Sequence, residues 1–197
     1  MNAGELVADK GGFSFLSEQC GKIFDTSKRL PDFVFRHCFA KYFAIEYGHI
    51  YGKSFGSFLF QMSTIFDDES ANYMALDPHP DSYYQNSSHF GAASFRPSSL
   101  VERYVPVLSR EQNVPQLLAG VNVGVFWGSS LKWGIFCDRL SWEMAVIAVS
   151  RTVDVPTISG FRCMDAAGVS SYMKSQYHWK PSAALEFIQT FLTNYPI

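Results

Sequence analysis

The chain has 197 residues, of which 47% are hydrophobic and 16% aromatic, a composition that suits one globular domain, residues 1–197, with a sizeable core. Its formal net charge is −2 and it has no basic run, so nucleic acid is not an expected partner. The longest apolar run has six residues, 144–149, against the roughly 20 that span a bilayer, which predicts no membrane-spanning segment. The first twelve residues do not resemble a secretory signal, so the protein is expected in the cytoplasm.

Two helices are predicted in the N-terminal part of the chain. The segment from Pro31 to Tyr47 has Pro at a suitable first helical position and apolar residues on nearly every side, which is typical of a buried helix. From Phe55 to Phe66, apolar residues recur at steps of three and four, which indicates one face of an amphipathic helix. Ser54 is the candidate N-cap of this second helix.

The segment from Asp77 to Pro97 is rich in Pro, Ser, Asn and Asp, and it is predicted to be a long loop. His79 and His89 share this segment with Asp77 and Asp81, a set that could hold a metal ion if the loop folded back on itself. Histidines in such loops are more often exposed to solvent. No metal and no other cofactor is therefore predicted.

The clearest pattern is the alternation of apolar with small or polar residues over 121–127, repeated over 131–137. The unbroken apolar run 144–149 suits a third strand that is covered on both faces. Residues 120–150 are therefore predicted to form a three-stranded antiparallel β-meander, packed with N-terminal and C-terminal helices in an α+β fold. The helix expected at the C-terminus has an apolar stripe at Leu185, Ile188, Leu192 and Tyr195.

Two chemical motifs overlap in EYGHIYGKSFGS, residues 46–57. Gly52 to Gly56 spell the GxSxG of an esterase nucleophile elbow, but the strand that must precede such an elbow is missing from the predicted elements. The same stretch resembles a phosphate-binding P-loop, yet only three residues follow Gly48 before the Gly-Lys pair, one fewer than that loop requires. Neither motif is accepted on these grounds.

A small hydrolase is kept as the alternative function. Ser54, Asp154 and His178 follow the chain order of one class of hydrolase triad. Cys38 and Cys137 offer thiol nucleophiles that could pair with His178, but both stand in apolar contexts, where burial raises a thiol's pKa and lowers its reactivity. An enzyme of this kind should place His178 within hydrogen-bond reach of its nucleophile inside a pocket.

The segment KWGIFCDRLSWEMAVIAVS, residues 132–150, resembles a pattern found in immunity proteins of bacterial polymorphic-toxin and type VI secretion systems. In that pattern a Trp-bearing strand leads through Asp-Arg into a second strand, which begins near a Glu and continues in small apolar residues. The resemblance implies a non-enzymatic protein that neutralises a cognate toxin by binding it. The matching positions are Trp133, Asp138, Arg139, Glu143 and the run 145–149.

Ring and Arg side chains in predicted loops are the expected contacts for such a toxin, because these residues dominate many protein interfaces. The candidate partner-binding residues are Tyr83, Tyr84, Arg96 and Arg139. A mildly acidic chain suits a basic partner such as a nuclease. A structural subunit of a larger assembly, or a homodimer, is a further alternative, and it predicts a large self-complementary apolar surface.

Overall fold

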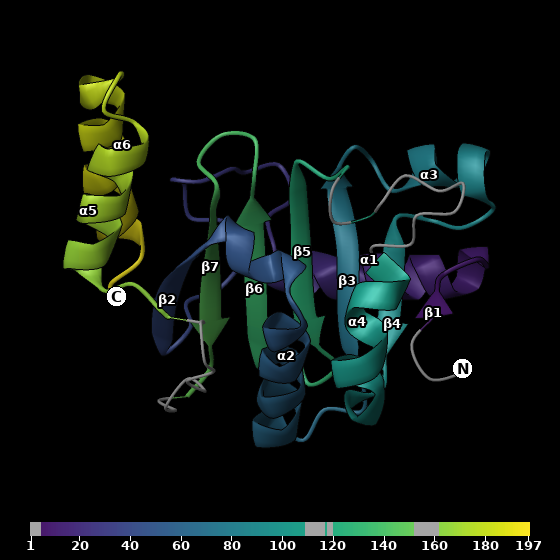
Figure 1. Ribbon diagram of the computed structural model, residues 1–197. Helices are drawn as coiled ribbons and strands as arrows, with labels where there is room; N and C mark the ends of the chain where they lie inside the picture. Colours follow the sequence, from purple (N-terminus) through teal and green to yellow (C-terminus); the bar gives the residue numbers. More distant parts are fainter. Residues whose placement is uncertain (1–4, 109–116, 118–119, 152–161) are drawn as a thin grey trace.

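The computed structural model describes residues 5–108, 117, 120–151 and 162–197 (Figure 1). Its strands are β1 (Glu5–Leu6), β2 (Lys41–Glu46), β3 (Ala71–Asp77), β4 (Ala92–Phe95), β5 (Val123–Gly128), β6 (Trp133–Asp138) and β7 (Met144–Val149). Its helices are α1 (Lys10–Ile23), α2 (Lys53–Phe66), α3 (Asp81–Ser87), α4 (Leu100–Leu108), α5 (Ala166–Gln176) and α6 (Pro181–Asn194), with 3-10 helices η1 (Tyr47–Tyr51) and η2 (Pro97–Ser99). The fold is of the α+β class. None of the helices described here combines the length and the apolar character that a membrane crossing demands.

The strands of the described residues form one antiparallel sheet in the order β1-β4-β3-β5-β6-β7-β2. β5, β6 and β7 are consecutive both in the chain and in the sheet, with Phe136 of β6 opposite Val125 on one side and Val146 on the other. The β-meander predicted over residues 120–150 is confirmed. Trp133, at the start of β6, has no exposed surface.

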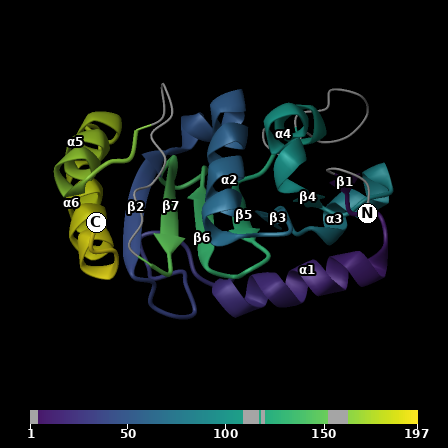
Figure 2. The same ribbon diagram turned by 90° about the horizontal axis from the view of Figure 1, so that it is seen from below.

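Helices cover both faces of this sheet (Figures 1 and 2). α2 and α4 lie against one face, α1 lies against the other, and the α5–α6 pair lies beyond the β2 edge. In β7, Ala145 and Ile147 pack into the core on the α2 side, whereas Val146 and Ala148 pack into the core on the α1 side. Burial on both faces requires an apolar side chain at every position, which explains the unbroken run.

The helix predicted from Pro31 to Tyr47 is wrong. Residues 41–46 form β2, which pairs with β7 so that Tyr42 stands opposite Ala148. The residues before β2 form turns and a loop. An apolar run without a clear period fits a strand buried on both faces as well as it fits a buried helix. The available edge of β7 selects the strand, because pairing there satisfies the backbone N–H and C=O groups of both segments.

The long loop predicted from Asp77 to Pro97 is also corrected, since this segment contains α3 and β4. β4 lies between β1 and β3, and Ala93 stands opposite Tyr73. The polar residues do mark exposure, because most of α3 faces solvent, but they do not mark an irregular backbone. Gly91 allows the close packing of this region, because a Cβ there would lie 2.7 Å from Cδ2 of Tyr83.

The amphipathic helix predicted to begin at Ser54 is confirmed as α2, with a small shift. The helix begins at Lys53, and its N-cap is Gly52. Ser54 therefore lies inside the first turn and is not the cap. Because Gly52 has no side chain, it leaves the first N–H groups of α2 without a side-chain cap.

The predicted C-terminal helix is confirmed as α6. Of its predicted stripe, Tyr195 is buried and Ile188 and Leu192 pack against the core, but Leu185 does not. Ala184, Phe187 and Phe191 are buried, whereas Leu185 is 57% exposed. The ring of Phe187 packs 4.3 Å from the ring of Trp142, which lies in the turn between β6 and β7. The phenylalanine face of α6 therefore packs against the β6–β7 turn.

Candidate functional site

The turn between β6 and β7, residues 139–143, closes the hairpin at one end of the sheet (Figure 1). The carboxylate of Asp138 accepts the backbone N–H of Ser141 at 2.9 Å, a local contact that tightens the turn. The backbone N–H of Arg139 donates to the carbonyl of Asn122 at 2.8 Å, which ties the turn to the strand beside it. Leu140, between these two anchors, is 70% exposed.

The connection between α5 and α6 packs against this turn. The phenol of Tyr177 donates to the carbonyl of Ser141 at 3.0 Å, and its ring lies 5.3 Å from the ring of Trp142. The indole N–H of Trp142 donates to the carbonyl of Leu30 at 2.9 Å. The turn and the helical connection are thus held in a fixed relation to each other.

Trp179, in this connection, is 61% exposed. Its ring lies 6.4 Å from the ring of Tyr177, and the ammonium of Lys180 lies 4.5 Å from its centroid, which is within cation–π range. Tyr177 also touches the 139–143 turn, so Trp179 and Leu140 are exposed at the same end of the molecule. We call Arg139, Leu140, Tyr177, Trp179 and Lys180 the tryptophan patch.

A cleft of about 650 Å³ lies beside the patch, between α5 and the junction of β2 with η1. We call it the α5 cleft. Tyr172 lines it and donates its phenol O–H to the carbonyl of Glu143 at 3.0 Å, which links the cleft to the same turn. The charged and polar lining of the cleft includes Glu46, His49, Arg162, Asp165, Tyr172 and Gln176.

The chemistry of the α5 cleft favours binding over nucleophilic attack. Burial raises the pKa of the Cys163 thiol to about 11, so this thiol stays protonated near neutral pH and is a weak nucleophile. Asp165 is engaged as the N-cap of α5, where it accepts the N–H of Gly168 at 2.8 Å. Burial, followed by the negative charges of Glu46 and Glu143, raises the pKa of the Tyr172 phenol. The carboxylates of Glu46 and Asp165 thus share the cleft with the guanidinium of Arg162.

Two of the predicted contact residues lie on α3 and have different environments. Tyr83 is buried, at 2% exposure, and burial followed by the nearby charge of Asp77 raises its pKa to about 12. The expectation that Tyr83 lies in an exposed loop is therefore wrong, and its ring is not accessible to a partner. Tyr84 is 42% exposed, but one face of its ring stacks on Phe90 at 4.7 Å.

The two predicted arginines lie at opposite ends of the sheet. Arg139 belongs to the tryptophan patch, whereas Arg96 follows β4 at the other end and lines a groove of about 620 Å³ beside α1. We call this second cavity the α1 groove. The four predicted contact residues consequently do not form one surface.

Sequence reasoning missed the two most exposed apolar residues of the patch. Leu140 stands in the DRLS turn between two apolar strands, and an apolar side chain at a hairpin turn is a usable signal of exposure. Trp179 directly precedes the Lys-Pro pair that starts α6, a position where the chain must be at the surface. Neither signal shows that the two residues lie on the same end of the molecule.

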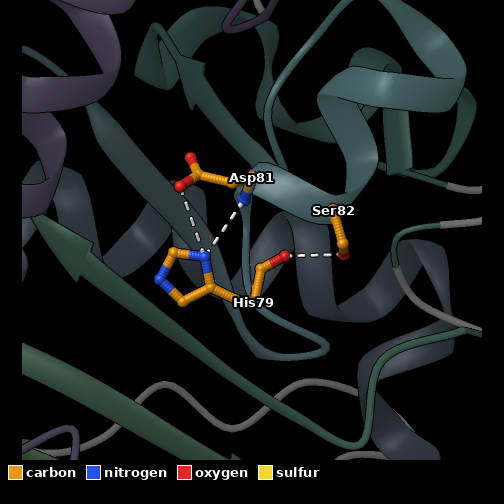
Figure 3. A network of polar contacts seen from close by, with 3 residues as sticks. All are labelled: His79, Asp81 and Ser82. Carbon is orange, nitrogen blue, oxygen red and sulfur yellow. Dashed lines mark hydrogen bonds and ion pairs between the residues drawn. The ribbon is translucent and has the colours of Figure 1, made fainter.

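The predicted His79 and His89 do not meet at a common site. His79 is exposed, and its ring lies 3.6 Å from the carboxylate of Asp81, while the Ser82 hydroxyl donates to the His79 carbonyl at 2.7 Å (Figure 3). His89 is buried, and its Nδ1 lies 3.1 Å from the carbonyl of Phe90. In the part of the chain that the structure describes, no three His, Cys, Asp or Glu side chains gather as a metal site would require.

The residues of the alternative hydrolase are separated in the structure. Ser54 lies on α2 against a face of the sheet, whereas His178 lies beyond the β2 edge, with Nδ1 3.0 Å from the carbonyl of Ser175 (Figures 1 and 2). Asp154 lies outside the described residues. Cys137 is buried on the α2 side of the core, and this burial raises its pKa well above the usual thiol value. Cys38 is exposed, so the burial expected of both thiols is wrong for Cys38.

No family model, curated protein or solved structure matches the chain. The resemblance of residues 132–150 to immunity proteins therefore depends only on the matching positions Trp133, Asp138, Arg139, Glu143 and 145–149. Its segment forms β6, the 139–143 turn and β7, and this turn supplies two residues of the tryptophan patch. The tryptophan patch is therefore the surface that bears on function.

Proposed function

We propose that the protein is an immunity protein, which acts in the bacterial cytoplasm, binds a cognate effector toxin and neutralises it by forming a tight complex without catalysis. One observation carries this proposal. The turn of the hairpin that resembles immunity proteins exposes Leu140, at the same end of the molecule as Trp179, which is 61% exposed. Two large apolar side chains at one end of a well-packed molecule are typical of an interaction surface.

The tryptophan patch has the composition of an interface centre. Trp, Tyr and Arg are the residues that most often dominate binding energy, and Trp179, Tyr177 and Arg139 supply one of each. Covering the exposed part of a Trp removes on the order of 100 Å² of apolar area from water, worth roughly 2–3 kcal/mol. Lys180 keeps a charge over the ring, so the patch has the polar rim that such centres usually have.

The patch is also held rigidly before any partner arrives. Tyr177 is fixed by its hydrogen bond to Ser141, and the ring of Trp142 packs behind it. A side chain that is already ordered loses little conformational entropy on binding, which increases the affinity obtained from a given contact area. This arrangement supports a tight complex.

The neighbouring α5 cleft indicates the charge of the partner. The carboxylates of Glu46 and Asp165 line it together with the guanidinium of Arg162, and the carboxylate of Glu143 lies near enough to act with Glu46 on the phenol of Tyr172, so acidic groups outnumber the arginine among the described residues. A basic toxin surface would be attracted to this cleft, which would accelerate its association with the tryptophan patch. A basic partner is part of the proposal for this reason.

The proposal is tested by capture and neutralisation. The tagged protein is expressed in its source cell, bound proteins are crosslinked and identified, and each candidate is expressed alone and together with this chain. We expect one captured protein to arrest growth when expressed alone and to be harmless in co-expression. Capture of this chain's own copies only, or a captured protein whose toxicity is unchanged by co-expression, would overturn the proposal.

A further inference from the structure

The α1 groove lies at the end of the sheet opposite the tryptophan patch. It is enclosed by α1 on one side and, on the other, by the α2–β3 turn, the end of β4 and the β5–β6 turn. Its volume of about 620 Å³ is within the range of small-molecule sites. Its lining includes Phe15, Gln19, Ser70, Ser94 and Arg96, with the carboxylates of Asp67 and Glu69.

A buried asparagine lies behind two of the serines that line this groove. Asn72 of β3 stands opposite Ser94 of β4 and opposite Trp127 of β5, so the three side chains form a row across the α1 face of the sheet. Hydroxyls of the groove residues Ser94 and Ser70 donate to Oδ1 of Asn72 at 2.8 and 3.2 Å. At the other end of the row, the indole of Trp127 donates to Gln19, a wall residue of the groove, at 3.2 Å.

The amide nitrogen of Asn72 has no hydrogen-bond partner among the described residues, although the residue is only 1% exposed. Turning the amide over would let its nitrogen donate to the serine hydroxyls, but its oxygen would then be the end without a partner. A buried polar group left unsatisfied destabilises a fold by about 1–3 kcal/mol. Because Oδ1 accepts from both groove serines, Asn72 fixes the direction in which their hydroxyls point.

We propose that the α1 groove is a binding site for a neutral saccharide. Hydroxyls, amides, carboxylates and a guanidinium together offer both donors and acceptors, as the many hydroxyls of a sugar require. Asp67 and Glu69 on the wall oppose an anionic ligand, and Arg96 opposes a cationic one. The ring of Phe15, 56% exposed on α1, supplies an apolar surface for the C–H face of a pyranose.

This site is independent of the proposed toxin complex, because it lies at the other end of the sheet from the tryptophan patch. Within this site, Phe15 and Asn72 have different roles. Phe15 would hold the face of the sugar ring, whereas the Asn72 layer would bind its hydroxyls through the serines above it.

The test uses the full chain labelled with ¹⁵N. Maltotriose, cellotriose and chitotriose are added in separate titrations, and the backbone amide resonances are monitored by NMR. At least one trisaccharide is expected to shift resonances of residues 15–19, 67–72, 94–96 and 129–130. Phe15→Ala should weaken that binding about tenfold, whereas Phe60→Ala, a change at a ring that is 38% exposed on α2, should leave it unchanged. Inorganic phosphate serves as the anionic probe and is expected not to shift these resonances.

Asn72→Leu provides the second measurement. It replaces the unsatisfied amide by an apolar group of similar size, so thermal stability should be kept or raised while saccharide binding is lost. Failure of all three trisaccharides to shift groove resonances would overturn the proposal. So would phosphate binding more tightly than any trisaccharide, or full binding by both Phe15→Ala and Asn72→Leu.

Discussion

The carboxylate of Asp68 accepts the indole N–H of Trp133 at 2.6 Å, which joins the α2–β3 turn to the first residue of β6. The other carboxylate oxygen accepts the backbone N–H of Ser130 at 2.7 Å. Both side chains are buried. Hydrogen bonds to a carboxylate are stronger than neutral ones, and here water does not compete for them. This pair connects two loops at the end of the sheet that the α1 groove occupies.

Trp133→Phe should destabilise the protein by about 1–3 kcal/mol, because it keeps most of the ring but leaves a buried carboxylate oxygen without its donor. Urea unfolding measures the free energy of unfolding. Trp179→Phe is the matched control, since the side chain of Trp179 is 61% exposed, and it should change stability by less than about 0.5 kcal/mol. Equal stability of the two variants would contradict the importance of the Asp68 contact.

Gly128→Ala should be more damaging than its small size suggests. A Cβ at position 128 would lie 2.2 Å from Oδ2 of Asp68 and 2.4 Å from Nε1 of Trp133, so the hydrogen bond would have to break. We expect a loss of about 2 kcal/mol or more in urea unfolding. Gly21→Ala, inside α1 with open space around its Cβ, should instead stabilise the protein by up to about 1 kcal/mol. A Gly128→Ala variant as stable as the parent would show that the 128–133 turn is free to adjust.

Asp138 should make the stability depend on pH. Burial raises its pKa, an effect that the Ser141 hydrogen bonds and the charge of Arg29 only partly oppose. A carboxyl group with a raised folded-state pKa contributes stability that is present below its unfolded pKa, about 3.9, and is lost as the pH rises through the folded value. Asp138→Asn keeps an oxygen for the Ser141 N–H but carries no charge.

The Asp138→Asn variant is therefore expected to be more stable than the parent at pH 7, with a difference that shrinks as the pH falls toward 4. Urea unfolding at pH 4, 5.5 and 7 measures this difference. A difference that grows toward low pH would have the opposite sign from the one that burial requires, and would contradict the prediction.

Two buried tyrosines should respond differently to loss of the hydroxyl. The Tyr83 hydroxyl has no partner among the described residues, so Tyr83→Phe should be neutral or slightly stabilising. The Tyr104 hydroxyl donates to the carbonyl of Ile50 at 2.7 Å, so Tyr104→Phe should destabilise by about 1 kcal/mol. Thermal unfolding of both variants is the measurement. A Tyr83→Phe variant that is clearly less stable than Tyr104→Phe would contradict the assignment.

The sequence predicted the β-meander because its turns are short and its strands pair with their neighbours in the chain. Residues 31–47 failed for the opposite reason. β2 pairs with β7, about one hundred positions away, and nothing in the local pattern of residues 41–46 distinguishes that strand from a buried helix. The class of the fold follows from local periodicity, whereas the position of β2 follows from the free edge of a distant strand.

The candidate site was only partly predictable for the same reason. Arg139 was found because its turn lies inside the segment that resembles immunity proteins. Trp179 joins it through the bond between Tyr177 and Ser141, which spans 36 positions, and no sequence pattern carries that contact. The polar segment around Tyr83 predicts an exposed ring, but the absence of a side chain at Gly91 lets that ring pack inward.

Trp179→Ala should separate binding from folding. The side chain is 61% exposed, so its removal costs the fold little, whereas a central Trp of an interface contributes about 2 kcal/mol or more to a complex, roughly thirtyfold in affinity. Leu140→Ala should act in the same direction with a smaller effect. Phe60→Ala, on α2 and away from the patch, is the matched control for loss of a partly exposed ring.

Isothermal titration with the captured toxin gives the affinities, and thermal unfolding gives the stabilities. If Trp179→Ala binds as tightly as Phe60→Ala, the tryptophan patch is not the toxin-binding surface. If Trp179→Ala loses affinity only in proportion to lost stability, the patch supports the fold and the interface lies elsewhere.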